Sequence, residues 1–375
     1  MANQKTIAVV LAGAVAKGAY EAGVLRALAR TDVRIARVVA ASSGALTATV
    51  LAAAVRTGDL IGGAERIASL WRDHAEWNEV FHLSFRELVK RDGVSDQKRL
   101  LALLRDHVAP SQPDHPQPVN LRVVVGALAG REGSIARRPA TTFEAICDFH
   151  GDDFASRAGI ERVFQAAVAS AAFPIVFAPV DVEGVGPSID GGCVNNTPVK
   201  WALDGAIGAE LDAVVVIASS VEHRTAPPAD VTGLTPLVSH LAEMLIDERL
   251  YRDLREAEQV NTALGQLDRL ARTGVLDAAQ LRSVVDALGW SRRRVVEIIA
   301  IRPDQPLRGN AFEAFFDRDR RSEYLAAGFE RGLDVLAGRG WSHRPVPRSV
   351  RHDDVVAVAA DPVVLPGAVE RDRAE

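Results

Sequence analysis

Three short segments of this 375-residue chain place residues that could do chemistry in turns next to predicted strands. The first runs from Leu11 to Gly18 and the second from Ala40 to Ala45, each directly after an apolar run. The third, Ser188 to Gly192, carries an aspartate followed by two glycines. Each segment alone fits an ordinary turn, and only the three together indicate chemistry.

The first segment is rich in small residues and lies between a predicted strand and a predicted helix. Small side chains there let backbone N–H groups at the helix N-terminus face an anion. A dinucleotide-binding turn is poorly matched, because Val15 stands where the second glycine of that fingerprint belongs. A Walker A loop is excluded, because Lys17 precedes Gly18 instead of following it.

The second segment puts a serine at the corner between a strand and a helix. Such an elbow exposes the serine Oγ above the sheet, with the helix N-terminus beneath it. The alternative is a serine that only caps the helix. Ser43 is a second candidate nucleophile, but only Ser42 has a glycine, Gly44, two positions on, as the elbow requires.

The third segment supplies a carboxylate, Asp190. A turn built around Asp-Gly is common and needs no function. However, a serine hydroxyl is a weak nucleophile until a base accepts its proton. A carboxylate within hydrogen-bond reach can do this, and more effectively where a partly desolvated site raises its pKa.

Short β-branched runs alternate with helical patterns along the chain. The predicted strands are Thr6–Leu11, Ile35–Ala41, Leu121–Leu128, Thr142–Asp148, Ala213–Ser219 and Val295–Ile301. The predicted helices are Ala19–Arg30, Ala45–Arg56, Ile160–Ala172, Leu234–Arg272, Ala278–Leu288 and Arg320–Leu336. Near-continuous apolar strands separated by helices indicate an α/β fold with a mainly parallel sheet covered on both faces. Asp277 and Gln280 form a capping signature before the helix at Ala278.

The order of the three segments resembles the patatin-like phospholipase family. In that family the first motif is usually a glycine triplet followed by a basic residue and Gly, the second is Gly-x-Ser-x-Gly, and the third is Asp-Gly-Gly or Asp-Gly-Ala. Four further stretches resemble family segments: Lys17–Leu25, Ala169–Pro174, Ile299–Leu307 and Ala327–Gly332. The likeness extends from about Ile7 to Leu336.

The resemblance implies a three-layer α/β/α patatin-like fold with a helical cap insertion. By position, Ser42 matches the nucleophile and Asp190 the base of a Ser-Asp dyad. The remaining matches are an oxyanion loop of Gly13, Ala14 and Val15 with Lys17 and Gly18, and elbow and Asp-turn support from Ala40, Gly44 and Gly191. We expect Lys17 to brace the loop, and the resemblance implies neither a metal nor an organic cofactor.

The chain departs from the family pattern at Ala14, Val15 and Ala40, where glycines are usual. Backbone N–H groups survive these changes, but a β-branched valine resists the positive φ that glycine tolerates. If the loop needs that geometry at Val15, the oxyanion hole is misaligned.

We expect one domain over residues 1–340, with a helical cap at about 70–118 and a helical segment at about 234–290. We expect residues 341–375 to form a loosely attached or disordered tail. Aromatic residues concentrate in the cap region, at Trp71, Trp77, Phe81 and Phe85. They indicate either a mobile cap that dips into a lipid interface or a helical subdomain that packs on the sheet, and we favour packing. The long helix ending at Arg272 fits packing, a lid, an acyl channel or a dimer contact.

The composition narrows the partner classes. A formal net charge of -5 argues against a nucleic-acid partner. The two cysteines have no metal-ligand or disulfide spacing, which fits a cytoplasmic protein. Val38 to Val55 is uncharged, but it is Ala-rich and poor in the residues that favour membrane insertion.

The sequence therefore predicts a serine acyl-ester hydrolase of phospholipase A or lysophospholipase type. Its expected partner is a phospholipid or another fatty-acyl ester, with peripheral membrane contact. Three alternatives remain: a catalytically impaired lipid-binding or regulatory relative, an acyltransferase, and an α/β-hydrolase triad that uses His223 or His240. The last is disfavoured, because that fold places its elbow after several strands.

Overall fold

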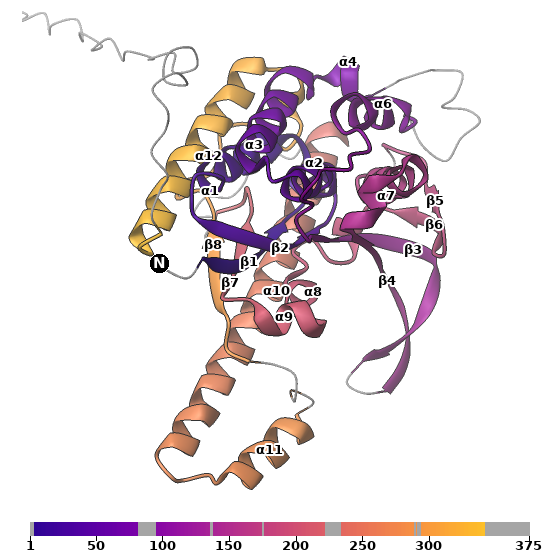
Figure 1. Cartoon of the computed structure of the whole chain (residues 1–375). Helices are drawn as coiled ribbons and strands as arrows, with labels where there is room; N and C mark the ends of the chain where they lie inside the picture. The colour runs from indigo at the N-terminus through magenta and orange to yellow at the C-terminus, as the bar shows by residue number, and fades with distance from the viewer. Residues whose placement is uncertain are drawn as a thin grey trace, which may run out of the picture. The chain divides into compact units, whose positions relative to one another are not determined.

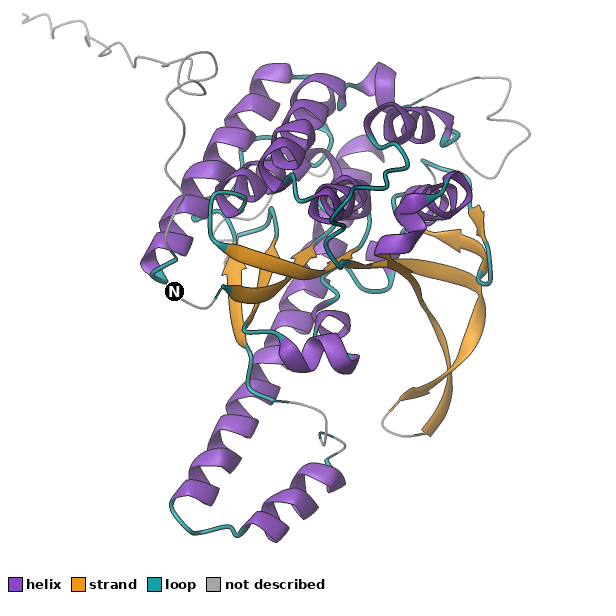
Figure 2. Ribbon diagram, viewed as in Figure 1, coloured by secondary structure: helices purple, strands orange, loops and turns teal. Residues whose placement is uncertain are grey.

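The computed structural model describes residues 4–81, 95–135, 138–174, 176–221, 234–288, 290 and 294–341. Their eight strands form one sheet in the order β5-β6-β3-β2-β1-β7-β8, with β4 paired to β3 (Figures 1 and 2). The strands are β1 (Lys5–Leu11), β2 (Val33–Ala40), β3 (Asn120–Ile135), β4 (Arg138–His150), β5 (Val180–Val182), β6 (Gly186–Ile189), β7 (Ala213–Ile217) and β8 (Glu297–Ile301). The five strands β3-β2-β1-β7-β8 are parallel, whereas the pairings β3–β4, β3–β6 and β5–β6 are antiparallel.

Helices cover both faces of this sheet, so the predicted layered α/β fold is confirmed (Figure 1). On one face lie α1 (Gly18–Leu28), α2 (Ser43–Thr57), α3 (Leu60–Ser69), α4 (Trp77–Val80), α6 (Lys98–His107), α7 (Arg157–Ser170) and α12 (Arg318–Gly338). On the other face lie α8 (Val199–Ala202), α9 (Gly205–Glu210) and α10 (Leu234–Arg272), and α11 (Ala278–Ala287) folds back beside the far end of α10. Shorter helical turns are η1 (Val15–Lys17), the π-helix η2 (Leu70–His74), η3 (Gly151–Ala155), η4 (Gly191–Cys193) and η5 (Glu313–Phe315).

The central strand β1 shows why the sheet is covered twice. Ile7, Val9 and Leu11 belong to the apolar core shared with α1, α2 and α12. Ala8 and Val10 point to the opposite face and join a second core with α8 and α10. When the side chains on both faces of a strand are buried, its sequence is a continuous run of apolar residues. That run is the pattern from which this strand was predicted.

The register of β1 and β2 brings the first two sequence motifs together. The two strands are parallel and end side by side, with Leu11 opposite Ala40. The chain therefore leaves both strands at the same edge of the sheet. Loops at the carboxyl ends of parallel strands are where α/β proteins build their binding sites.

The third motif arrives from an antiparallel strand. β6 pairs with β3 through Ile189 opposite Gly126, and it runs back toward the elbow before the chain reaches Asp190. The sequence did not predict β5 or β6, which are three and four residues long. These two short strands nevertheless bring Asp190 to the edge that carries the other two motifs.

Several sequence expectations fall partly or wholly outside the described residues. They concern Phe85 and His223, the side chain of His240, and residues 342–375 of the predicted tail. Residues 82–94 of the predicted cap also lie outside, and its assignment as a cap stays a prediction.

The capping signature before α11 is confirmed, because the Asp277 carboxylate accepts from the Gln280 amide and the Gln280 side chain accepts from the Asp277 amide.

Candidate active site

Ser42 lies at the corner between β2 and α2 in a strained conformation. Its backbone φ is 54°, a value that residues other than glycine rarely adopt. The Ser42 N–H donates to the Ser170 Oγ at 2.9 Å, and that hydroxyl donates to the Val124 carbonyl at 2.6 Å. A Cβ at Gly44 would lie 2.6 Å from the Ala12 carbonyl oxygen, so this position requires glycine. The predicted elbow is therefore present.

The Ser42 hydroxyl contacts Asp190. Its Oγ–H donates to the Asp190 Oδ2 at 2.7 Å, between residues 148 positions apart in the sequence. The other carboxylate oxygen accepts the Gly192 N–H at 2.7 Å. Because the serine donates to Asp190, its hydroxyl does not cap α2, which excludes the capping alternative.

The environment of Asp190 changes its acidity. Its side chain is only 2% exposed, and this burial raises its pKa from 3.8 to about 7. The hydrogen bonds from Ser42 and Gly192 oppose the shift, because they stabilise the ionised form. The result is a carboxylate with the basicity of a histidine at neutral pH.

The loop after β1 approaches the elbow closely. A Cβ on Gly13 would lie 2.6 Å from the Ser42 Cβ, so a larger residue does not fit there. Val15 adopts a φ of 51°, the positive value that glycine would tolerate more easily. Two of the loop amides already have acceptors, since the Gly13 N–H donates to the Asn196 Oδ1 and the Ala14 N–H to the Ser43 Oγ, both at 3.0 Å.

A largely apolar pocket opens beside Ser42 and Asp190. The empty space in and around its open mouth, solvent included, measures about 970 Å³. Apolar side chains from α2, α3, η2, α6 and η5 form most of its wall, among them Leu46, Ile67, Trp71, Leu104 and Phe315. The polar side chains along it belong to Ser42, Ser43, Thr47, His74 and Asp190. The pocket therefore offers room for an apolar chain whose polar end meets the serine.

A comparison with protein-family models matches residues 9–203, just over half of the chain, to "Patatin-like phospholipase". The matched range includes both Ser42 and Asp190. The chain belongs to the patatin-like phospholipase family. Family membership indicates lipid acyl hydrolase activity, with lipid esters as the substrate class.

The chain was also compared with solved structures and with curated proteins. The crystal structure of VipD from Legionella pneumophila is similar to this chain at 12% sequence identity and a TM-score of 0.38, covering 89% of this chain and 67% of that one. A search of curated proteins finds no match.

The other residues expected from patatin motifs lie around the site. Gly18 lies against Trp71, where a Cβ would be 2.1 Å from the indole ring. Gly191 lies against the Val124 carbonyl oxygen, and a Cβ at this position would be 2.1 Å from that oxygen. Ala40 is fully buried at the end of β2. Lys17 is half-buried in η1 and is not among the pocket residues.

Asn196 and Ser170, which the sequence did not single out, hold the site together with the hydroxyl of Ser43. Asn196 binds Gly13 twice, since its Oδ1 accepts the Gly13 N–H and its Nδ2 donates to the Gly13 carbonyl at 3.3 Å. Ser170 fixes the Ser42 amide, and the Ser43 hydroxyl fixes the Ala14 amide. Asn196 follows Asp190 by six positions, but no local pattern reveals that its partner is 183 positions away.

The aromatic residues of the predicted cap region mostly pack. Trp71 and Phe81 are buried, and the Trp71 Nε1–H donates to the Thr47 Oγ1 at 2.9 Å. Trp77 stacks on Phe316, with ring centroids 4.8 Å apart. Packing is therefore the correct interpretation for Trp71 and Phe81. Phe316, which lies outside the predicted cap region and stacks on Trp77, keeps 66% of its surface exposed.

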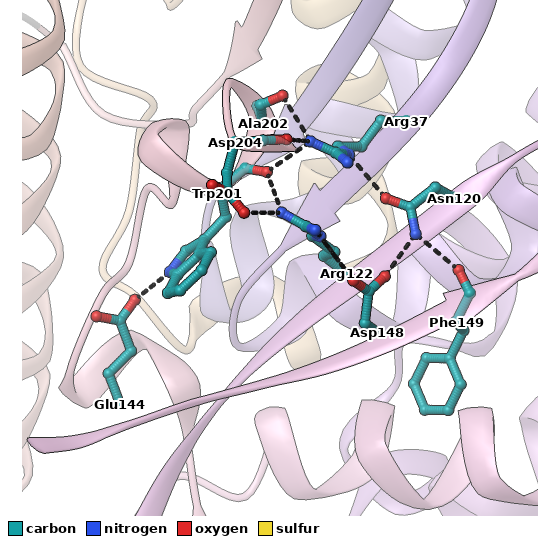
Figure 3. Close-up of polar contacts among 9 residues, drawn as sticks. All are labelled: Arg37, Asn120, Arg122, Glu144, Asp148, Phe149, Trp201, Ala202 and Asp204. Atoms are coloured by element: carbon teal, nitrogen blue, oxygen red, sulfur yellow. Dashed lines mark hydrogen bonds and ion pairs between the residues drawn. The ribbon is translucent and has the colours of Figure 1, made fainter. Parts of the chain in front are cut away.

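A polar network anchors the segment that follows Asp190 to strands β2, β3 and β4 (Figure 3). The Glu144 carboxylate accepts the Trp201 Nε1–H at 2.6 Å and the Asn195 Nδ2–H at 2.7 Å, and it pairs with Lys200. The Arg37 guanidinium donates to three backbone carbonyls at the end of α8, those of Trp201, Ala202 and Asp204. The Trp201 and Ala202 carbonyls are ones that the C-terminal end of α8 leaves without helical partners, whereas Asp204 is the residue just before α9.

Within the described ranges, no group of three His, Cys, Asp or Glu side chains is arranged to hold a metal ion. None of the helices in those ranges combines the length and apolar character needed to cross a membrane.

Proposed function

We propose that this protein is a serine acyl-ester hydrolase of phospholipase A or lysophospholipase type. The observation that carries the proposal is the hydrogen bond from the Ser42 Oγ to the Asp190 Oδ2, at the polar end of an apolar pocket. The pocket accommodates the acyl chain, and the ester carbonyl meets the serine.

The chemistry needs two residues and water. Asp190 accepts the Ser42 proton while the Ser42 Oγ bonds to the acyl carbon, and the carbonyl electron pair moves to oxygen. When the tetrahedral intermediate collapses, the bond to the alcohol breaks and Asp190 returns the proton to the leaving oxygen. Water then attacks the acyl-enzyme with Asp190 again as base, which releases the fatty acid and restores Ser42.

A pKa of about 7 suits Asp190 to both parts of this cycle. A general base works best when its pKa lies near the working pH, because it is then largely ionised and still basic. An exposed aspartate would be ionised but too weak a base to activate a serine hydroxyl.

The proposal includes peripheral contact with a lipid surface. The exposed Phe316 ring stacks on Trp77, and its neighbours Phe312 and Phe315 line the pocket. Aromatic rings of this kind suit the interface between headgroups and acyl chains. The cytoplasmic location expected from the sequence stays a prediction.

The test is turnover of lysophosphatidylcholine and of p-nitrophenyl esters by the wild type and by Ser42→Ala and Asp190→Asn. We expect each variant to lose a factor of at least about 10³ in kcat. Free fatty acid as the product supports hydrolysis, whereas acyl transfer to added glycerol or lysolipid supports the acyltransferase alternative. Lipid binding without any Ser42-dependent turnover supports the non-catalytic alternative and refutes the proposal.

A further inference from the structure

The segment that runs from α3 into η2 forms one wall of the apolar pocket. Ile67, Leu70, Trp71 and His74 recur at the spacing of one helix face, and all four line the pocket. η2 follows α3 directly and is a π-helix, a wide turn that proteins often place at functional sites. Trp71 carries the largest side chain of this wall.

Trp71 fills the space between the pocket and two neighbouring helices. Its Nε1–H donates to the Thr47 Oγ1 on α2 at 2.9 Å, so one edge of the indole contacts α2. The ring also lies against the start of α1, where a Cβ on Gly18 would be 2.1, 2.4 and 2.6 Å from three of its carbons. The indole therefore occupies the space in which a side chain at position 18 would lie, and it separates the pocket from α1.

The place of the indole along α2 determines which part of a substrate meets it. Ser43 and Thr47 both line the pocket, and they are four residues apart in α2. Four residues correspond to about 6 Å along a helix axis. An acyl chain whose carbonyl meets Ser42 therefore passes Trp71 a few bonds beyond the ester.

Contacts from α12 hold this wall in place. The Arg321 side chain is 2% exposed, and its guanidinium donates to the carbonyl of Arg72, the residue after Trp71, at 2.9 Å. The carboxylate of the next residue, Asp73, accepts from Arg318 at 2.6 Å. The backbone beside Trp71 is thus fixed to α12 and its ring to α2, so the wall resists displacement by a wider chain.

We propose that Trp71 is a specificity-determining residue that restricts the acyl chains of this protein to unbranched ones. The inference rests on the proposed acyl-hydrolase function. A straight chain passes beside the indole, whereas a branch or a ring at that point needs the space that the indole fills. Removal of the indole opens this space, because Gly18 has no side chain that could fill it.

The test compares p-nitrophenyl 4-phenylbutyrate, which carries a ring on its fourth carbon, with the linear hexanoate ester. In the wild type, kcat/KM for the phenylbutyrate should be lower by a factor of about ten or more. Equal values overturn the proposal. In Trp71→Ala, we expect the ratio of phenylbutyrate to hexanoate to rise about tenfold, because the phenyl ring enters the vacated space.

Trp341→Ala is the matched control. Trp341 belongs to the same apolar core as Trp71 and is similarly buried, at 5% against 9% exposure, but it does not line the pocket. Its substitution should lower stability without changing the ratio. An unchanged ratio in Trp71→Ala, or an equal rise in Trp341→Ala, overturns the proposal.

Trp71→Phe provides a second comparison that creates a smaller cavity. It should give a smaller rise in the ratio, and Trp341→Phe should give none. Esters of one linear acid with p-nitrophenol and with 2-naphthol complete the experiment, because their ratio should stay at the wild-type value in Trp71→Phe. A change in this ratio alone overturns the proposal, since the indole then meets the alcohol. Failure of the wild type to hydrolyse linear esters refutes the acyl-hydrolase function itself and is a different result.

Discussion

At the scale of single residues, Asp190 combines burial with two hydrogen bonds. Burial favours its neutral form, and the donors Ser42 and Gly192 favour its ionised form. Burial has the larger effect, so the pKa settles at about 7 and not at the usual 3.8. The group therefore changes charge within the range in which enzymes usually work.

This pKa predicts a pH dependence of catalysis. Only the ionised Asp190 can accept the serine proton, so kcat/KM should rise about tenfold per pH unit below 7 and become constant above it. The measurement is a pH profile with p-nitrophenyl butyrate in the free-enzyme regime. A profile that is already flat from pH 5 upward would show that Asp190 is not the base.

Val15 predicts an unusual order of stability. At most positions alanine is more stabilising than glycine by about 0.5–1 kcal/mol, because glycine loses more backbone entropy. The φ of 51° at Val15 reverses this preference, because only glycine adopts such a value without strain. We expect Val15→Gly to be more stable than Val15→Ala by about 1 kcal/mol.

Urea unfolding of the two variants tests this order. Both lose the same branched side chain, so the comparison isolates the backbone conformation. A more stable Val15→Ala would mean that the loop does not hold the left-handed conformation in solution.

Some residues of the site could be predicted from the sequence, and others became visible only in the structure. Ser42 and Asp190 could be found because each lies in a short motif with a steric reason for its glycines. Asn196 and Ser170 could not, because their partners Gly13 and Val124 lie 183 and 46 positions away. A side chain that acts only through a distant contact leaves no mark on its own neighbourhood in the sequence.

At the scale of elements, Asp190 depends on the segment that follows it. Residues 191–201 cross from the site to α8, and Glu144 on β4 holds this segment through Asn195, Lys200 and Trp201. Arg37 and Asn120 hold the end of α8 and the adjacent strands (Figure 3). The position of the base is therefore determined by β2, β3 and β4 as much as by its own turn.

Substitution of Glu144 tests this anchoring. Glu144→Ala leaves the partly buried donors of Asn195 and Trp201 without an acceptor, which should cost about 1–3 kcal/mol of stability and lower kcat. Glu144→Gln keeps one acceptor oxygen and should lose less of both. Thermal unfolding and ester turnover provide the two readouts. Wild-type stability and kcat in Glu144→Ala would contradict the account.

The elements that the sequence predicted are those with strong periodicity. β1 and β7 are buried on both faces, and α10 has the predicted bounds Leu234–Arg272. β5 and β6 are too short to show a period of two, and their pairing depends on β3. The sequence therefore predicted the central sheet but not the edge that delivers Asp190.

At the scale of the whole molecule, the pocket is a joint product of distant segments. Residues from α2, α6 and η5 meet around one apolar space, although the sequence separates them widely.

The length of the acyl chain should change the rate of hydrolysis. Burial of a methylene group is worth about 0.8 kcal/mol, so each added methylene that enters the pocket should raise kcat/KM about threefold to fourfold. The increase should stop when the pocket is full.

Leu103 allows this prediction to be tested. Leu103 lines the pocket, and the neighbouring Leu101 has similar exposure but does not. Leu103→Trp should shorten the acyl chain at which kcat/KM stops rising, whereas Leu101→Trp should leave that length unchanged. A series of p-nitrophenyl esters from acetate to palmitate provides the measurement. The same plateau in both variants would show that the chain binds elsewhere.

The most direct test of the central claim is covalent labelling by a fluorophosphonate, followed by intact-mass spectrometry and peptide mapping. The account predicts one adduct per chain, located on Ser42, absent in Ser42→Ala and formed much more slowly in Asp190→Asn. An unlabelled wild type, or equal labelling of wild type and Ser42→Ala, would contradict it.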